Sequence, residues 1–224
     1  MNLTKNKKKQ IEGLNLDKSY PVLEAVKLLK EKKYVKFDES VEISINTGID
    51  SKQSDQNVRG SFVPPHGLGK KVEIAVFAQG KNADDAKSLG VKRVGGEDLA
   101  TMLQNKIDVD VIIATPDMMS VVSKIAKTLG PKGLMPNPKT GTVTNDVKST
   151  IDNINKGLVA YKSDKAGTIH AALGKLSFEE NQISENINSF IEEIKKIKPS
   201  GLKGNFINSV FISSTMGVGL KVEI

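Results

Sequence analysis

The chain has 224 residues, which is enough for one large domain or two ordinary ones with a sizeable core. It contains no cysteine, which excludes disulfide bonds and thiolate metal sites. Its net charge of +7 favours an acidic partner such as nucleic acid, and the absence of Trp and scarcity of Tyr and Phe favour folded RNA over stacked single strands. No apolar run reaches the roughly 20 residues of a membrane helix, and the basic start carries no secretory signal. We therefore expect a cytoplasmic protein without a membrane partner.

The first segment combines a basic start, one amphipathic helix and one alternating strand. Four lysines lie within residues 5–9, as in a frayed terminus or an arm that becomes ordered on RNA. Pro21 opens the helix, and apolar residues recur at helical spacing over 22–29. Alternation over 41–45 then predicts a half-buried strand, and residues 50–60 are expected to form a polar connector.

A Pro/Gly-rich break at residues 64–70 precedes a change in pattern. Strands and helices then alternate, with strands expected over 72–76 and 109–114 and helices over 83–89, 97–106 and 146–156. This alternation predicts a small doubly wound, Rossmann-like α/β domain. The domain lacks a Gly-x-Gly-x-x-Gly fingerprint, and the break lacks the residues of a phosphate-binding P-loop. We therefore expect no cofactor.

One further helix in this part leads into a long irregular loop. Thr115 is its expected cap, and apolar spacing continues as far as Leu129. Gly130 is predicted to end the helix in the left-handed conformation. The following loop, residues 129–144, contains a Leu134-Met135 pair, which we expect to hold the loop against the domain while its lysines point outward.

The last segment returns to the character of the first. A strand is expected over 168–175, a helix with an apolar face over 183–194, and a final strand over 206–213. Neither terminal segment holds enough elements for a core by itself. We therefore expect residues 1–66 and 158–224 to form one discontinuous α+β domain, with residues 67–157 inserted as the α/β domain. The two chain crossings would form a hinge that includes Pro65, His66, Gly67 and Gly157.

The chain offers little to an enzyme. Its only histidines are His66, in the Pro/Gly-rich break, and His170, within a predicted strand. No serine or carboxylate lies in a recognisable nucleophile or metal motif. An α/β enzyme acting on a nucleotide or RNA remains an alternative, and so does a free RNA chaperone.

Residues 129–143 read Leu-Gly-Pro-Lys-Gly-Leu-Met-Pro-Asn-Pro-Lys-Thr-Gly-Thr-Val, which resembles the signature run of the ribosomal L-one family. That family forms the mobile stalk beside the tRNA exit site of the large subunit. Similar runs stand at 36–39, 54–60 and 215–217, so the resemblance covers nearly the full length. It implies a non-enzymatic protein that is a monomer when free and binds large-subunit rRNA through the discontinuous domain. Its other implied partners are the rest of the large subunit, exit-site tRNA and the mRNA of its own operon, whose translation it would repress.

The resemblance also indicates an RNA-binding face. A Thr-Met-Gly turn suits an RNA minor groove, because a hydroxyl, a flexible apolar side chain and close backbone approach come together. Ser209 matches a further contact position, whereas Ala166 stands where the family more often has Asn or Thr, which leaves a backbone contact there. Pro64 stands where the family usually has Leu, which could stiffen the hinge. The residues expected at the RNA are Lys36, Phe37, Lys165, Thr168, His170, Ser209, Thr215, Met216 and Gly217.

Overall fold

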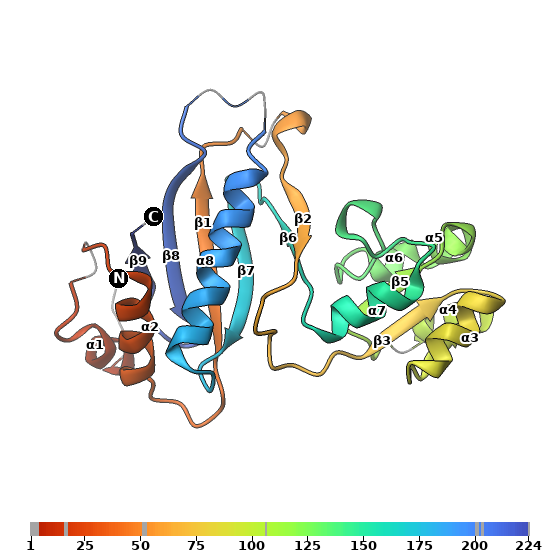
Figure 1. The fold of residues 1–224 in the computed structure, drawn as a ribbon, viewed down its shortest axis with the longest axis horizontal. Coiled ribbons are helices and arrows are strands. Elements are labelled where there is room, and N and C mark those ends of the chain that lie inside the picture. The colour runs from red at the N-terminus through yellow and green to blue at the C-terminus, as the bar shows by residue number, and fades with distance from the viewer. Residues whose placement is uncertain are drawn as a thin grey trace. The chain divides into compact units, whose positions relative to one another are not determined.

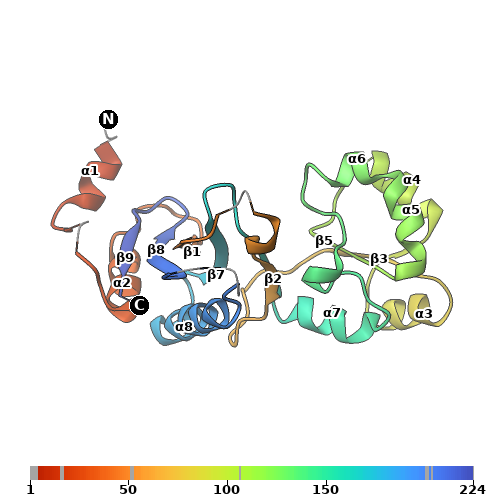
Figure 2. The ribbon, with the colours of Figure 1, turned by 90° about the horizontal axis from the view of Figure 1, so that it is seen from above.

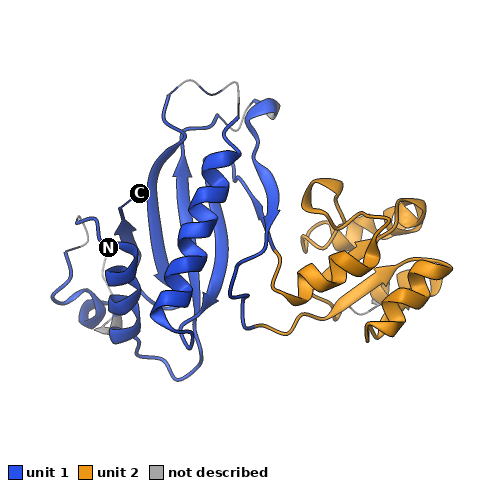
Figure 3. Cartoon of the chain, viewed as in Figure 1, with its two compact units in different colours: residues 1–69, 159–224 blue, residues 70–158 orange. Residues whose placement is uncertain are grey.

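A computed structural model of the chain describes residues 5–15, 18–50, 53–105, 107–199, 202 and 204–223. The chain divides into two compact units, shown in two colours in Figure 3. Unit 1 consists of residues 1–69 and 159–224, and unit 2 of residues 70–158. The predicted mixed α/β fold class is confirmed. Within the described ranges, no helix is long and apolar enough to cross a membrane.

An antiparallel sheet of order β7-β1-β8-β9 forms the centre of unit 1 (Figure 1). Its strands are β1 (Ser40–Thr47), β7 (Thr168–Lys175), β8 (Ile207–Ser214) and β9 (Leu220–Val222). Two helices, α2 (Val22–Glu31) and α8 (Glu180–Lys196), lie on the same side of this sheet (Figure 2). The alternating side chains of β1 that point to this side are buried in one hydrophobic cluster with both helices. The other face of the sheet carries the polar half of the alternation.

Helix α8 has clear start and stop signals in the sequence. Glu179 and Gln182 form a capping box, in which each side chain bonds the other residue's backbone amide. Its buried face includes Ile187 and Phe190, and Lys195 and Lys196 lie in the last turn, where the helix dipole favours cations. The predicted face over 183–194 is therefore confirmed, although the helix ends at Lys196, before Pro199.

Several short elements of unit 1 were not predicted. The basic start forms a short helix, α1 (Lys5–Ile11), rather than a frayed terminus, and the buried Gln10 donates to the Lys32 carbonyl at 3.4 Å. The expected connector contains a 3-10 turn, η1 (Ser54–Gln56), and then a strand, β2 (Arg59–Phe62). This strand pairs antiparallel with β6 (Val159–Lys162), so the two chain segments that flank unit 2 form a two-stranded ribbon.

Unit 2 contains a parallel sheet of order β4-β3-β5 with helices on both faces (Figure 2). Ala75 and Phe77 face a cluster that includes residues of α4 and α5, whereas Ile74 and Val76 face α3 and α7. Burial on both faces explains the nearly continuous apolar runs of these strands. The elements are β3 (Ile74–Phe77), α3 (Lys81–Ser88), β4 (Arg93–Gly95), α4 (Glu97–Asn105), β5 (Val111–Ala114), η2 (Pro116–Met118), α5 (Met119–Lys124), α6 (Ala126–Leu129), η3 (Pro138–Thr140) and α7 (Val147–Asn155).

The helix expected after Thr115 is divided into three short pieces, and its predicted end is wrong. Gly130 is right-handed, with φ −57° and ψ −53°. The left-handed residue is Gly133, with φ +71°, and the Leu134 amide donates to the Leu129 carbonyl at 3.2 Å, which closes a Schellman-type turn. Docking of Leu134 on the hydrophobic cluster selects this later turn, whereas Met135 is exposed and does not share the anchoring role.

Candidate nucleic-acid interface

The side of the unit 1 sheet away from its helices presents polar side chains in register, and we call it the open face. Thr168, Asn46 and Ser209 form one cross-strand row, and His170, Ser44 and Phe211 form the next. All six side chains are exposed or half-buried. The register therefore brings the predicted residues Thr168, His170 and Ser209 onto one surface. The sequence analysis missed Asn46, Ser44 and Phe211, although the polar half of the predicted alternation was a signal for the first two.

His170 is fixed on this face by neighbours on both sides. Its Nδ1 lies 3.0 Å from Ser44 Oγ, and its Nε2 lies 3.8 Å from Asp164 Oδ2. The His170 side chain is exposed, so these contacts orient the ring without removing it from solvent. Among the described residues, no group of acidic or histidine side chains could hold a metal ion.

The turn that precedes β7 is closed by Asp164. Its Oδ1 accepts hydrogen bonds from the Ala166 and Thr168 amides, both at 2.8 Å. The bond from Thr168 is the main reason that the pKa of Asp164 is lowered, and the Ala166 bond and the nearby His170 act in the same direction. Lys165 lies at the exposed tip of this turn. Because the Ala166 amide already bonds Asp164, it is not available as a donor for the backbone contact expected at this position.

A second group of predicted residues lies at the opposite end of β1. Val41, near the start of β1, pairs with Ser214, the last residue of β8, so the segments beyond them are neighbours. Lys36 and Phe37 precede β1, and the Thr-Met-Gly turn follows β8. Phe37 is 51% exposed and Met216 is 46% exposed. The structure therefore places two large apolar side chains and one exposed cation near this sheet end.

The Thr-Met-Gly turn is held closely to β1. Thr215 Oγ1 accepts from the Ser40 amide at 3.0 Å, and the Thr215 amide donates to the Ser40 carbonyl at 3.1 Å. The Met216 amide donates to Glu39 Oε1 at 2.8 Å. A Cβ on Gly217 would lie 2.3 Å from Ser214 Oγ, so the turn favours glycine at this position. Glu39 was not among the predicted site residues.

Of the residues expected at the hinge, Pro65, His66 and Gly67 belong to unit 1, and Gly157 belongs to unit 2. Pro65 and His66 form a turn in unit 1, and His66 Nε2 lies 2.5 Å from Glu185 Oε2. The Gly67 carbonyl accepts from Asn186 Nδ2 at 3.2 Å. In unit 2, Gly157 follows α7 with φ +97°, and its amide bonds the Ile154 carbonyl at 2.9 Å.

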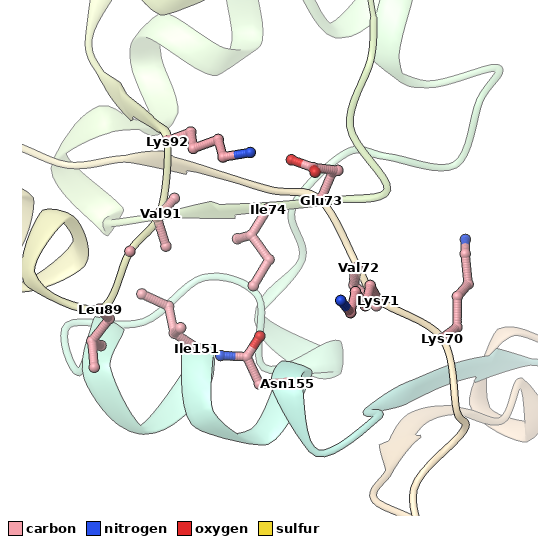
Figure 4. A pocket seen from close by; sticks show the side chains of 11 residues that line it. Lys70, Lys71, Val72, Glu73, Ile74, Leu89, Val91, Lys92, Ile151 and Asn155 are labelled. Carbon is pink, nitrogen blue, oxygen red and sulfur yellow. The ribbon is translucent and has the colours of Figure 1, made fainter.

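Unit 2 has a hollow of about 340 Å³, which lies beside the amino ends of its strands. Figure 4 shows Ile74, Val91 and Ile151 turned into it, with Lys92 on its rim and Lys70 directed away. Ligands of doubly wound folds bind outside the carboxyl ends of the strands, which is the other edge of the sheet. The hollow therefore does not resemble a nucleotide site of such folds.

The chain is similar to known proteins over nearly its whole length. The profile of the family described as "Ribosomal protein L1p/L10e family" matches residues 29–218. The chain is 50% identical over 222 residues to the large ribosomal subunit protein uL1 of Coxiella burnetii (strain Dugway 5J108-111), across 99% of this chain and 96% of that protein. It is also 50% identical over 222 residues to uL1 of Alcanivorax borkumensis, with the same coverage, and 50% identical over 209 residues to uL1 of Thermosipho africanus, across 92% and 90%.

The chain therefore belongs to the ribosomal protein L1p/L10e family. This confirms the resemblance drawn from the sequence. Membership also places the chain among ribosomal proteins rather than enzymes, as the sequence analysis predicted.

Proposed function

We propose that this protein is a structural component of the large ribosomal subunit that binds large-subunit rRNA through unit 1. The observation that carries this proposal is the juxtaposition of predicted contact residues on one side of the unit 1 sheet. Hydroxyl, amide and imidazole groups line the open face, and Phe37 and Met216 are exposed beyond its end. Such groups suit the 2′-hydroxyls, sugars and shape of folded RNA. The family's relatives, named as large-subunit proteins, support the same assignment.

Footprinting tests this proposal directly. The purified protein is expected to protect one contiguous segment of large-subunit rRNA, saturably and without ATP, and to leave small-subunit rRNA unprotected. A variant with Ser209→Ala and His170→Ala on the open face is expected to lose the protection while its melting temperature stays close to that of the wild type. An enzyme acting on RNA would instead show turnover, with cleavage or modification of the RNA over time. Absence of any specific protection would contradict the proposal.

We further propose that the protein forms the mobile stalk of the cytoplasmic ribosome, contacts exit-site tRNA to assist its release, and represses translation of its own mRNA. The net charge of +7 and the monomeric form expected for the free protein are compatible with these roles. The experiment for repression is a reporter that carries the leader of its own operon, with and without excess protein. Unchanged reporter synthesis would remove the regulatory role without affecting the rRNA-binding role.

A further inference from the structure

Glu39 is buried in the protein, which is rare for a residue with a carboxylate side chain. Its side chain is 1% exposed, immediately before β1. Burial of a carboxylate is unfavourable unless hydrogen bonds compensate for the lost water. The bond that Glu39 Oε1 accepts from the Met216 amide, at 2.8 Å, provides such compensation. The Glu39 carbonyl also accepts from the Leu176 amide at 2.9 Å, so the residue is fixed at both its backbone and its side chain.

All three amide donors of the Thr-Met-Gly turn are used inside the protein. The Thr215 amide bonds the Ser40 carbonyl at 3.1 Å, the Met216 amide bonds Glu39, and the Gly217 amide bonds the Ser214 carbonyl at 3.1 Å. The Thr215 hydroxyl accepts from the Ser40 amide at 3.0 Å and donates to the Ser40 carbonyl at 3.4 Å, so this donor is also used inside the protein. By contrast, no hydrogen bond within the described ranges engages the carbonyl oxygens of Met216 and Gly217. The turn thus offers acceptors rather than donors to a ligand.

This polarity restricts which part of an RNA the turn can bind. Phosphate oxygens only accept hydrogen bonds, so they gain nothing from a row of carbonyls. Ribose 2′-hydroxyls both donate and accept, and they are the groups that distinguish RNA from DNA. A free Met216 amide could donate a hydrogen bond to phosphate. Because this amide donates to Glu39 instead, it is not available to phosphate.

We propose that Glu39 is a positioning residue, which holds the Met216 amide so that the Thr-Met-Gly turn selects ribose hydroxyl donors over phosphate. Glu39 does not touch RNA in this arrangement, because it is buried beneath the turn. The proposal rests on the proposed rRNA binding and adds the chemical group that this part of the site recognises.

The test compares three variants at this position on two ligands. The ligands are the rRNA segment protected in the footprint and the same segment with 2′-deoxyribose throughout. Glu39→Gln keeps an oxygen that can accept from Met216, and it is expected to bind both ligands within about threefold of the wild type. Glu39→Ala is expected to bind the RNA roughly tenfold or more weakly, because the turn is released, but to lose much less affinity for the deoxy ligand. The ratio of the two affinities should therefore fall.

A matched control removes the same charge elsewhere in unit 1. Glu192 is exposed on α8, and Glu192→Gln is expected to leave both affinities and their ratio unchanged. If Glu39→Ala fails to fold, Glu39→Asp serves instead, because it keeps the charge but withdraws the oxygen by one methylene. A folded Glu39→Ala or Glu39→Asp protein with wild-type affinity and ribose selectivity would overturn the proposal. If the wild type itself binds neither ligand, rRNA binding has failed and not merely the role of Glu39.

Discussion

The buried side chain of Asn186 accepts a hydrogen bond from the backbone amide of His66, with 3.1 Å between His66 N and Asn186 Oδ1. The same side chain donates to the Gly67 carbonyl at 3.2 Å and to the Leu173 carbonyl at 2.8 Å. Asn186 is 0% exposed, and its bond to the Leu173 carbonyl is fully buried, whereas the two bonds to His66 and Gly67 are partly buried. One amide on α8 therefore joins strand β7 to the chain segment that leads toward unit 2.

Replacement of Asn186 by Ala should destabilise unit 1. The change leaves an amide and two carbonyls with reduced hydrogen bonding, and each buried unsatisfied group costs about 1–3 kcal/mol. We expect the free energy of unfolding to fall by about 2–4 kcal/mol, measured by urea denaturation. Asn188 is exposed on the same helix, and Asn188→Ala is the matched control, with little change expected. Equal stability of the two variants would show that the bonds of Asn186 contribute little.

Met216→Ala should weaken RNA binding without unfolding the protein. Because Met216 is exposed, the stability change is expected to stay within about 0.5 kcal/mol. Ile212 lies on β8, the strand that leads into the turn, but its side chain is buried in the core. Ile212→Ala should therefore lower the free energy of unfolding by about 2–5 kcal/mol. Thermal melts and filter binding on both variants check the contrast. A large loss of stability in Met216→Ala, with normal RNA binding by the folded fraction, would remove Met216 from the interface.

Lys36→Ala should change the salt dependence of RNA binding. If Lys36 neutralises one phosphate, its loss should lower the slope of log affinity against log salt by roughly 0.7–0.9. The exposed Lys87 of α3 in unit 2 provides a control with the same charge change. Titrations at several salt concentrations measure both slopes. Identical slopes for the wild type and Lys36→Ala would place Lys36 away from the phosphates.

Alkaline pH should destabilise unit 1 through Tyr161. Burial raises the pKa of Tyr161 from 10.0 to about 12, and the charge of Glu193 adds to the shift. Between these values the unfolded tyrosine loses its proton while the folded one keeps it, so stability is intact below pH 10 and falls as the pH rises toward 12. Tyr161→Phe should make this fall shallower, as measured by chemical denaturation across the range. Tyr34→Phe, at an exposed position, should leave it unchanged.

Unit 2 should fold when isolated as residues 70–158. Its two hydrophobic clusters contain only its own residues, and the cluster of unit 1 likewise draws only on residues 1–69 and 159–224. We expect a single cooperative thermal transition for residues 70–158, followed by circular dichroism. A second chain that joins Gly69 to Val159 through a short glycine linker tests unit 1 in the same way. Loss of folding in either chain would show that its core depends on the other unit.

The sequence predicted the long elements because their patterns are local. The apolar positions 41, 43 and 45 alone indicate β1, and the capped, periodic face of α8 is readable in the same way. The short strands β2 and β6 have little pattern of their own and exist because they pair with each other. The bond from Met216 to Glu39 joins residues 177 positions apart, so the sequence around either residue does not predict it. Likewise, Gly130 and Gly133 are equal candidates for a left-handed turn until the docking of Leu134 is known.

The pairing of β1 with β7 and β8 also sets an order of events during synthesis. Ser44 meets His170 across 126 positions, so the central sheet of unit 1 cannot close until the ribosome has translated most of the chain. Unit 2 is continuous in sequence and can collapse as soon as residue 158 has emerged. Long-range pairings form slowly because loop closure must precede them. The nascent chain should therefore hold a folded unit 2 while β1 is still unpaired, because β7 and β8 have not yet been made. During that interval β1 is the segment most in need of a chaperone.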